Sequence, residues 1–195
     1  VATFNTLNGI SNKNITLTSG LEDDLDKLIT GADTLSDGAS AANTQNTSAL
    51  KIKVKDAVDS ASKIALLDDL VTATTGAVTA SVSGAASINA SLTNLKATDK
   101  ITFSISGDAT VAELAGLAGK TAEADISLGG NITGTDVFQF MKDEGTFDTK
   151  TDNYTAAKGH TTAENIVLND TGKTTLAMTA AKNITALNAI MADAE

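Results

Sequence analysis

Few side chains in this sequence are suited to catalysis, and they form no recognisable catalytic pattern. His160 is the only histidine, and a catalytic or metal-binding histidine needs a carboxylate or a nucleophile beside it. The sequence offers only distant candidates, so we interpret His160 as an exposed loop residue. Because Cys is absent, a Cys–His nucleophile pair is excluded, and a single histidine excludes a two-histidine metal site. We assign no catalytic or cofactor-binding residue and expect no enzyme.

Two acidic groups have the oxygen ligands that Ca²⁺ prefers. The first consists of Glu22, Asp23, Asp24 and Asp26. A calcium loop must wrap around its ion, whereas these residues fall in the first turns of an expected helix, where the helix dipole favours negative charge. The second group, Asp68 and Asp69 with Lys63 five residues earlier, indicates an exposed helix face. Adjacent carboxylates diverge around a helix and suit paired acid and base catalysis poorly. Calcium remains a possible ligand, with no metal-binding residue assigned.

Composition excludes two classes of partner. The chain of 195 residues has a formal net charge of −10, and all 14 basic residues are lysines. Nucleic-acid binding needs a basic footprint and usually the arginine fork, so we expect no nucleic-acid partner. No apolar run reaches the roughly 18 residues of a membrane span, so none is expected. Because the chain opens at Val1 without an initiator Met, we expect a processed chain or a segment of something longer.

The elements that would position these residues repeat along the chain. Segments 79–84, 102–107 and 124–130 each alternate apolar and polar residues and end in glycine, and Gly84, Gly107 and Gly130 are spaced by 23 residues. Such alternation predicts strands. The pair formed by Gly129 and Gly130 lacks the spacing of a phosphate-binding loop, so we interpret it as the tight corner of a repeat.

Apolar residues at helical spacing follow most of these strands. Ile88, Leu92 and Leu95 follow the first strand, and Val111, Leu114 and Leu117 the second, whereas the pattern after Gly130 is looser, with Val137, Phe138 and Met141. Strand-then-helix units are also expected at 15–29 and 50–67, and strands at 165–168 and 175–178 precede a final helix over 184–191. Ser19 with Glu22, and Thr110 with Glu113, have capping-box spacing.

These patterns predict an α/β fold, a parallel β/α solenoid of about six short strand-helix repeats forming a single unit over 1–195. Such short repeats leave room only for parallel stacking of successive strands, with helices on one side. Segments 31–49 and 145–163 interrupt the rhythm and are rich in Asn, Thr, Ser, Ala and Gly. We expect them to be surface loops or insertions, the first with a frayed helical end.

The run from Ser81 to Gly107 resembles the degenerate Ala/Thr/Ser-rich repeats of large secreted bacterial surface proteins, which include S-layer-like proteins and adhesins exported by type I secretion. The resemblance covers residues 75–130 well and 50–74 and 164–195 loosely. It implies an extracellular, cell-surface location and association with other copies or with neighbouring domains of a larger surface protein. The calcium-binding Gly-Gly-x-Gly-x-Asp nonapeptide is missing, so those calcium sites are not carried over.

Three functions remain open. The leading hypothesis is a structural component of a bacterial extracellular surface layer or filament, acting through repeat stacking and self-assembly. The alternative is an adhesin or phage-type receptor-binding module that uses the loops 31–49 and 145–163. A solenoid hydrolase is least favoured, because carbohydrate sites are usually lined by Trp, Tyr and Arg, whereas Trp and Arg are absent here and Tyr154 is the only tyrosine.

Overall fold

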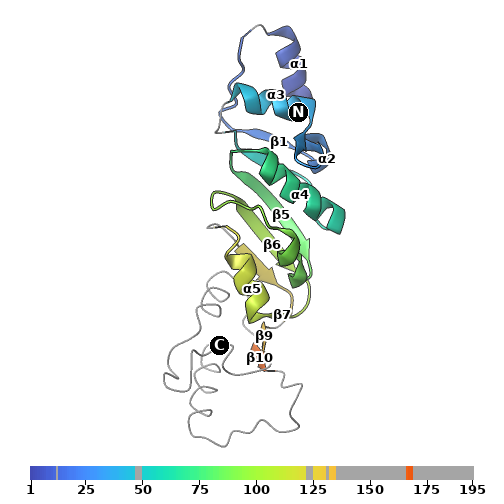
Figure 1. The fold of residues 1–195 in the computed structure, drawn as a ribbon, viewed down its shortest axis with the longest axis vertical. Coiled ribbons are helices and arrows are strands. Elements are labelled where there is room, and N and C mark those ends of the chain that lie inside the picture. Colours follow the sequence, from blue (N-terminus) through green and yellow to red (C-terminus); the bar gives the residue numbers. More distant parts are fainter. Residues whose placement is uncertain (12, 47–49, 122–124, 131, 135–165, 169–195) are drawn as a thin grey trace, which may run out of the picture. The chain divides into compact units, whose positions relative to one another are not determined.

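A computed structural model describes residues 1–11, 13–46, 50–121, 125–130, 132–134 and 166–168 (Figure 1). The helices are α1 (Ala2–Ile10), α2 (Leu25–Leu28), α3 (Asp37–Gln45), α4 (Ala61–Ala73), α5 (Val111–Ala118) and the 3₁₀ helix η1 (Ala86–Ser91). The strands are β1 (Leu21–Asp23), β2 (Ile29–Gly31), β3 (Thr34–Leu35), β4 (Ile52–Val54), β5 (Val78–Gly84), β6 (Lys100–Ile105), β7 (Ala109–Thr110), β8 (Asp125–Leu128), β9 (Ile132–Gly134) and β10 (Ile166–Leu168).

The chain divides into two compact units. Among the described residues, unit 1 contains those up to Gly84, those of 88–103, and 120–121, and unit 2 contains 85–87, 104–119 and those from 125 onward. Short repeats contact mainly their neighbours in sequence, so a chain built from such repeats need not form one cooperative body.

The fold is mixed α/β, with a five-stranded parallel sheet in the order β1-β4-β5-β6-β8. In unit 1 the register pairs Leu21 with Ile52, and Ile52 with Val78. Neighbouring strands of this sheet therefore follow one another along the chain. Only short strands that belong to other sheets lie between them in sequence. Parallel neighbours need a crossover between them, and α4 provides it between β4 and β5. Strands β5 and β6, predicted from the segments ending at Gly84 and Gly107, are confirmed as neighbours.

The buried side chains explain why these segments are strands. In β5, Val78, Ala80 and Val82 are at most 3% exposed and alternate with Thr79 and Ser81, which are more exposed. β-Branched residues on one side of a pleated strand pack well against neighbouring strands. In β6 the same face is supplied by Ile101, Phe103 and Ile105. The core is accordingly a thin layer of small and medium apolar side chains.

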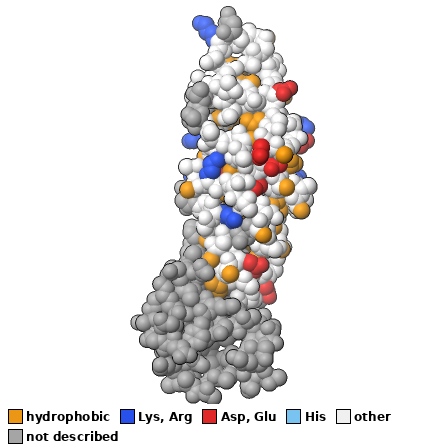
Figure 2. All heavy atoms as spheres, in the orientation of Figure 1, with side chains coloured by type: hydrophobic (Ala, Val, Ile, Leu, Met, Phe, Trp, Pro, Cys, Tyr) orange, Lys and Arg blue, Asp and Glu red, His pale blue; other side chains and the backbone are white. Residues whose placement is uncertain are grey.

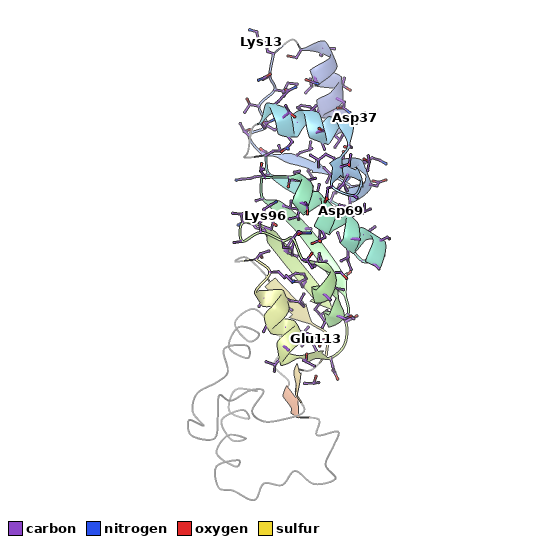
Figure 3. The ribbon with its side chains drawn as sticks, viewed as in Figure 1. Lys13, Asp37, Asp69, Lys96 and Glu113 are labelled. Carbon is purple, nitrogen blue, oxygen red and sulfur yellow. The ribbon has the colours of Figure 1, made fainter. Side chains whose placement is uncertain are left out.

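Helix α5 forms as predicted, whereas the helix expected after Val54 is shifted, because α4 begins only at Ala61 and leaves Ala61 and Ala65 exposed. Helix α4 buries Ile64, Leu67 and Leu70 at helical spacing, and Ser60 caps it by accepting the backbone N–H of Lys63 at 3.4 Å. At the start of α5 the capping box is confirmed (Figure 3): the Thr110 hydroxyl accepts the Glu113 N–H at 3.2 Å, and the Glu113 carboxylate accepts the Thr110 N–H at 2.9 Å.

In unit 2, the strands β7, β9 and β10 form a second parallel sheet in the order β10-β9-β7. Its register pairs Ala109 with Ile132 and Ile132 with Ile166. Strand β10 confirms the strand predicted near residue 166. The glycines of the repeat come together: a Cβ atom on Gly130 would lie 2.3 Å from the carbonyl carbon of Gly107. Only glycine allows this approach at Gly130, and the interpretation of Gly129 and Gly130 as the corner of a repeat stays a prediction.

The strand-helix unit predicted over 15–29 is wrong in its boundaries. Glu22 belongs to β1, so it does not form a capping box with Ser19, and only Leu25–Leu28 is helical. The Leu21 N–H instead donates to the Lys51 carbonyl at 2.8 Å. Gly20 allows this pairing: its φ is +88°, and a Cβ atom there would lie 2.3 Å from the Lys51 carbonyl oxygen. Pairing with the next strand overrides the local capping signal.

The interpretation of residues 31–49 as a loop or insertion is also wrong for the part described. Strands β2 and β3 form an antiparallel hairpin, and α3 follows directly. Helix α3 buries Gly38, Ala39 and Ala42, residues so small that their periodicity is easily missed. Asn5 of α1 and Val1, the N-cap of α1, both lie against Gly38. Their close approach explains why small residues are needed there.

Two further predictions have different outcomes. The helix expected from Ile88 to Leu95 is reduced to η1, which ends at Ser91, and Asp68 binds the backbone and side chain of Asn94 beyond that end. The loop 145–163, the residues Val137, Phe138 and Met141, the strand 175–178 and the helix 184–191 lie outside the described residues.

Candidate functional site

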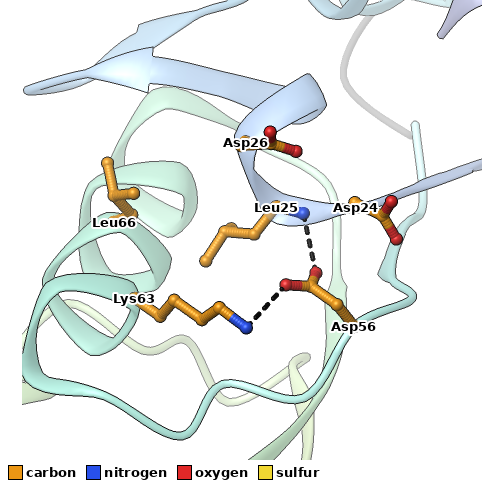
Figure 4. Close-up of a pocket in the computed structure, with 6 residues that line it drawn as sticks. All are labelled: Asp24, Leu25, Asp26, Asp56, Lys63 and Leu66. Atoms are coloured by element: carbon orange, nitrogen blue, oxygen red, sulfur yellow. Dashed lines mark hydrogen bonds and ion pairs between the residues drawn. The ribbon is translucent and has the colours of Figure 1, made fainter.

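An open hollow of about 350 Å³ in unit 1 collects acidic side chains around one lysine (Figure 4). Its lining comprises Asp24, Leu25, Asp26, Asp56, Lys63 and Leu66. Helix α2 and the residue before it contribute the first three, and α4 contributes the last two. Thus the acidic run predicted as one helix start is divided, and only Asp24 and Asp26 reach this hollow.

Asp56 connects the two sides of the hollow. Its Oδ1 accepts the backbone N–H of Leu25 at 2.8 Å, and its Oδ2 lies 3.0 Å from the Lys63 ammonium. Asp59 lies 3.5 Å from the same ammonium. Asp56 therefore satisfies a free backbone amide at the start of α2. The side chain of Asp24, the N-cap residue of α2, makes no such capping hydrogen bond.

The electrostatics of this pair favour permanent charge. Burial by itself would raise the pKa of Asp56, but the hydrogen bonds from Leu25 and Lys63, together with the charge of Lys63, hold that pKa below its ordinary value. The hydrogen bond to Asp56 raises the pKa of Lys63, with burial opposing it and the charges of Asp56 and Asp59 adding to it. Groups shifted in these directions stay ionised near neutral pH, so they suit binding and positioning better than proton transfer.

Two more aspartates hold separate parts of the chain together in the same manner. Asp68 accepts the Asn94 N–H at 2.8 Å and the Thr93 hydroxyl at 3.0 Å. Asp99 is fully buried and accepts the Val78 and Lys96 N–H groups, each at 2.7 Å. We name Asp56, Asp68 and Asp99 the carboxylate clips. Because a buried carboxylate without partners is very costly, Asp99 fixes the segments that supply its donors, whereas Asp56 and Asp68 are only partly buried and hold theirs through charge-assisted hydrogen bonds.

The clips revise the sequence interpretation of the acidic residues. Asp68 was expected on a solvated helix face, but it is a structural acceptor, whereas Asp69 beside it makes no clip. Sequence reasoning missed Asp56 and Asp99. Their positions were the available signal: Asp56 stands two residues after Val54, at the end of β4, and Asp99 stands one residue before Lys100, at the start of β6. A short acceptor next to a strand can reach backbone donors of the next segment.

Lys96 lies beside the Asp99 clip (Figure 3). Its ammonium is 3.4 Å from the Gly76 carbonyl and 3.5 Å from the Thr74 hydroxyl. Burial lowers the pKa of Lys96, and the charge of Asp99 opposes that effect. These contacts hold the turn that leads into β5.

The part of the chain that the structure describes contains no grouped ligands for the Ca²⁺ that the sequence left possible. Within it, no three His, Cys, Asp or Glu residues are grouped so that they could hold a metal ion, and calcium binding stays a prediction. His160 and Tyr154 lie outside the described residues. None of the helices described is long and apolar enough to cross a membrane.

Comparison of the chain with models of protein families, with curated proteins and with solved structures found no match in any of the three.

Proposed function

We propose that this chain is a structural component of a bacterial extracellular surface layer or filament, and that it acts by stacking repeats and by self-assembly rather than by catalysis. In this proposal the sheet and its helices are part of a parallel β/α solenoid of about six repeats. The resemblance of residues 81–107 to secreted surface-protein repeats favours the extracellular location.

One observation carries the proposal: successive strands of the chain are neighbours in one parallel sheet. A solenoid grows in this way, because each repeat covers the apolar layer of the one before it. The direct contact between Gly107 and Gly130 supports the same reading, since it brings equivalent positions of two repeats together.

The chemistry of the described site also favours a structural role. Its carboxylates are engaged in holding backbone N–H groups, and the ion pair of Asp56 and Lys63 stays charged near neutral pH. A surface-layer protein needs a durable and regular shape more than it needs a reactive group.

Electron microscopy of the purified chain at high concentration, with and without Ca²⁺, tests this proposal. We expect ordered filaments or sheets that coat bacterial cells. A chain that stays monomeric under both conditions and decorates no cell surface would rule out self-assembly and leave only the role of a spacer.

A further inference from the structure

The strand β4 and its flanks place three lysines on one side of unit 1. Leu50, Ile52 and Val54 are at most 5% exposed, while the residues between and after them, Lys51, Lys53 and Lys55, are exposed. Successive side chains of a strand point to opposite faces, and alternate ones are about 6.7 Å apart. The three ammonium groups therefore form a row, which we name the lysine strip, on the sheet face turned away from the core.

The strip keeps an excess of positive charge. Glu22 on the neighbouring strand lies 3.0 Å from the Lys53 ammonium and neutralises it in part. Lys53 remains 59% exposed in this pair, and exposed pairs of this kind bind weakly.

The helical side of the same unit has the opposite charge. We name Asp26, Asp59 and Asp69 the acidic helix face. Asp26 is 67% and Asp59 57% exposed, and Asp69 lies on α4 (Figure 3). The basic residues near them are Lys27, paired with Asp26 at 2.8 Å, and Lys63, engaged with Asp56. Figure 2 shows acidic side chains on the surface of this part of the molecule.

The lysine strip projects from the face of β4 opposite its buried side chains, whereas the acidic helix face lies on α2, on α4 and just before α4. The chain as a whole carries −10, and two copies repel each other unless they approach with unlike faces. A contact between two different faces is heterologous, and such a contact leaves a free face of each kind at the two ends, so that it can propagate.

We propose that the lysine strip of one copy docks against the acidic helix face of a second copy. This inference rests on the proposed function and specifies the surfaces through which copies assemble. Asp26 lies at the rim of the open hollow with its carboxylate turned away from Lys63, so an incoming lysine can approach it from outside (Figure 4). Because the contact depends on exposed charges, it weakens as salt shortens the Debye length from about 10 Å at 0.1 M to about 3 Å at 1 M.

Sedimentation velocity of the full chain tests the docking, with circular dichroism confirming that each variant is folded. The wild type should associate in low salt and dissociate in salt of about 1 M. K51E/K55E, which spares the pair of Lys53 and Glu22, should raise the apparent dissociation constant at least about tenfold. The matched control K13E/K120E makes the same change in net charge away from both surfaces and should change it by less than about twofold.

A charge-swap mixture makes the test specific. D26K/D59K should associate with itself as poorly as K51E/K55E does, since each has two faces of like sign. Mixing the two variants should restore association, because the reversed strip of one meets the reversed helix face of the other.

Each other outcome has a definite meaning. Association of the wild type that K51E/K55E leaves unchanged would overturn the docking and leave the proposed function standing. A wild type that never associates would overturn both. If K51E/K55E lost binding to polygalacturonate while its assembly was unchanged, the partner of the strip would be an acidic polymer, and the docking of copies would be wrong.

Discussion

Two regions of unit 1 are held to their neighbours by different means. The strands β4 and β5 bind each other through backbone hydrogen bonds, over apolar side chains that are almost wholly buried. The segment 13–20 instead depends on amide side chains: Gln45 accepts the Ile15 N–H at 2.8 Å, and Asn46 accepts the Leu17 N–H at 2.7 Å. Few buried apolar contacts back these bonds, since Ile15 and Leu17 are only half-buried.

Buried apolar packing therefore holds the centre of the parallel sheet more strongly than side-chain hydrogen bonds hold its N-terminal end. A region held by a packed apolar layer opens only when the whole unit unfolds, whereas one held by a few side-chain hydrogen bonds opens locally at lower free energy. The predictions below test this difference.

The largest effect is expected at Phe103 on β6, next to the central strand β5 of the sheet. Phe103 is fully buried, so Phe103→Ala removes its contacts and leaves a cavity, at a cost of about 3–5 kcal/mol in the free energy of unfolding. Urea denaturation followed by circular dichroism measures this loss. A cost below about 1 kcal/mol would mean that the centre is loosely packed.

The next effect is expected at the buried clip. Asp99→Ala leaves the N–H groups of Val78 and Lys96 without their acceptor, which should cost about 3 kcal/mol by the same measurement. Asp99→Asn keeps one carbonyl oxygen as an acceptor and should lose less. Equal losses for the two variants would show that the hydrogen bonds do not carry the effect. Asp33→Asn on the exposed turn serves as the control, because Asn tolerates the positive φ of +51° at this position.

Asn46 should matter less and only locally. Asn46→Ala removes the acceptor of the Leu17 N–H and the donor to the Ile15 carbonyl, so the free energy of unfolding should fall by about 1 kcal/mol. Hydrogen exchange should accelerate at the amides of 15–17 and stay unchanged in β5. Equal acceleration in both places would contradict the difference between the two regions.

The smallest effect is a pH dependence at Asp56. The folded-state pKa of Asp56 is lowered, so its contribution to stability is complete above the unfolded-state pKa of about 3.9 and is lost as the pH falls through the folded value. The charged groups facing it are Lys63, Asp59, Asp24 and Asp26. Below about pH 4 the Leu25 amide should exchange faster, and Asp56→Asn should remove that step. An unchanged pH profile in this variant would exclude Asp56 as the cause.

The same two regions differ in how far the sequence predicts them. Strands β5 and β6 follow from alternation, because Val, Ile and Phe supply a strong period of two. Helix α5 follows from Thr110 and Glu113, whose capping box is a local interaction. The N-terminal part could not be predicted, since β1 exists through its pairing with β4, and α3 buries only glycine and alanine.

The candidate site was hardest to predict, for a related reason. A clip is defined by a distant donor: Asp56 binds Leu25, and Asp99 binds Val78, across more than 20 residues of chain. An aspartate with such a donor and an aspartate in solvent look alike in sequence, so Asp68 was assigned to an exposed face.

The most direct test of the parallel stack is a disulfide across its register. The chain contains no cysteine, so Lys53→Cys with Thr79→Cys introduces a single pair at positions that are partners in β4 and β5. Strands about 4.8 Å apart bring such a pair within the reach of a disulfide, whereas Lys53→Cys with Ser81→Cys adds about 6.7 Å along the strand and exceeds it. Mass spectrometry after mild oxidation should find the cross-link in the first pair and not in the second. The opposite result, or no cross-link in either folded variant, would contradict the parallel register on which the account depends.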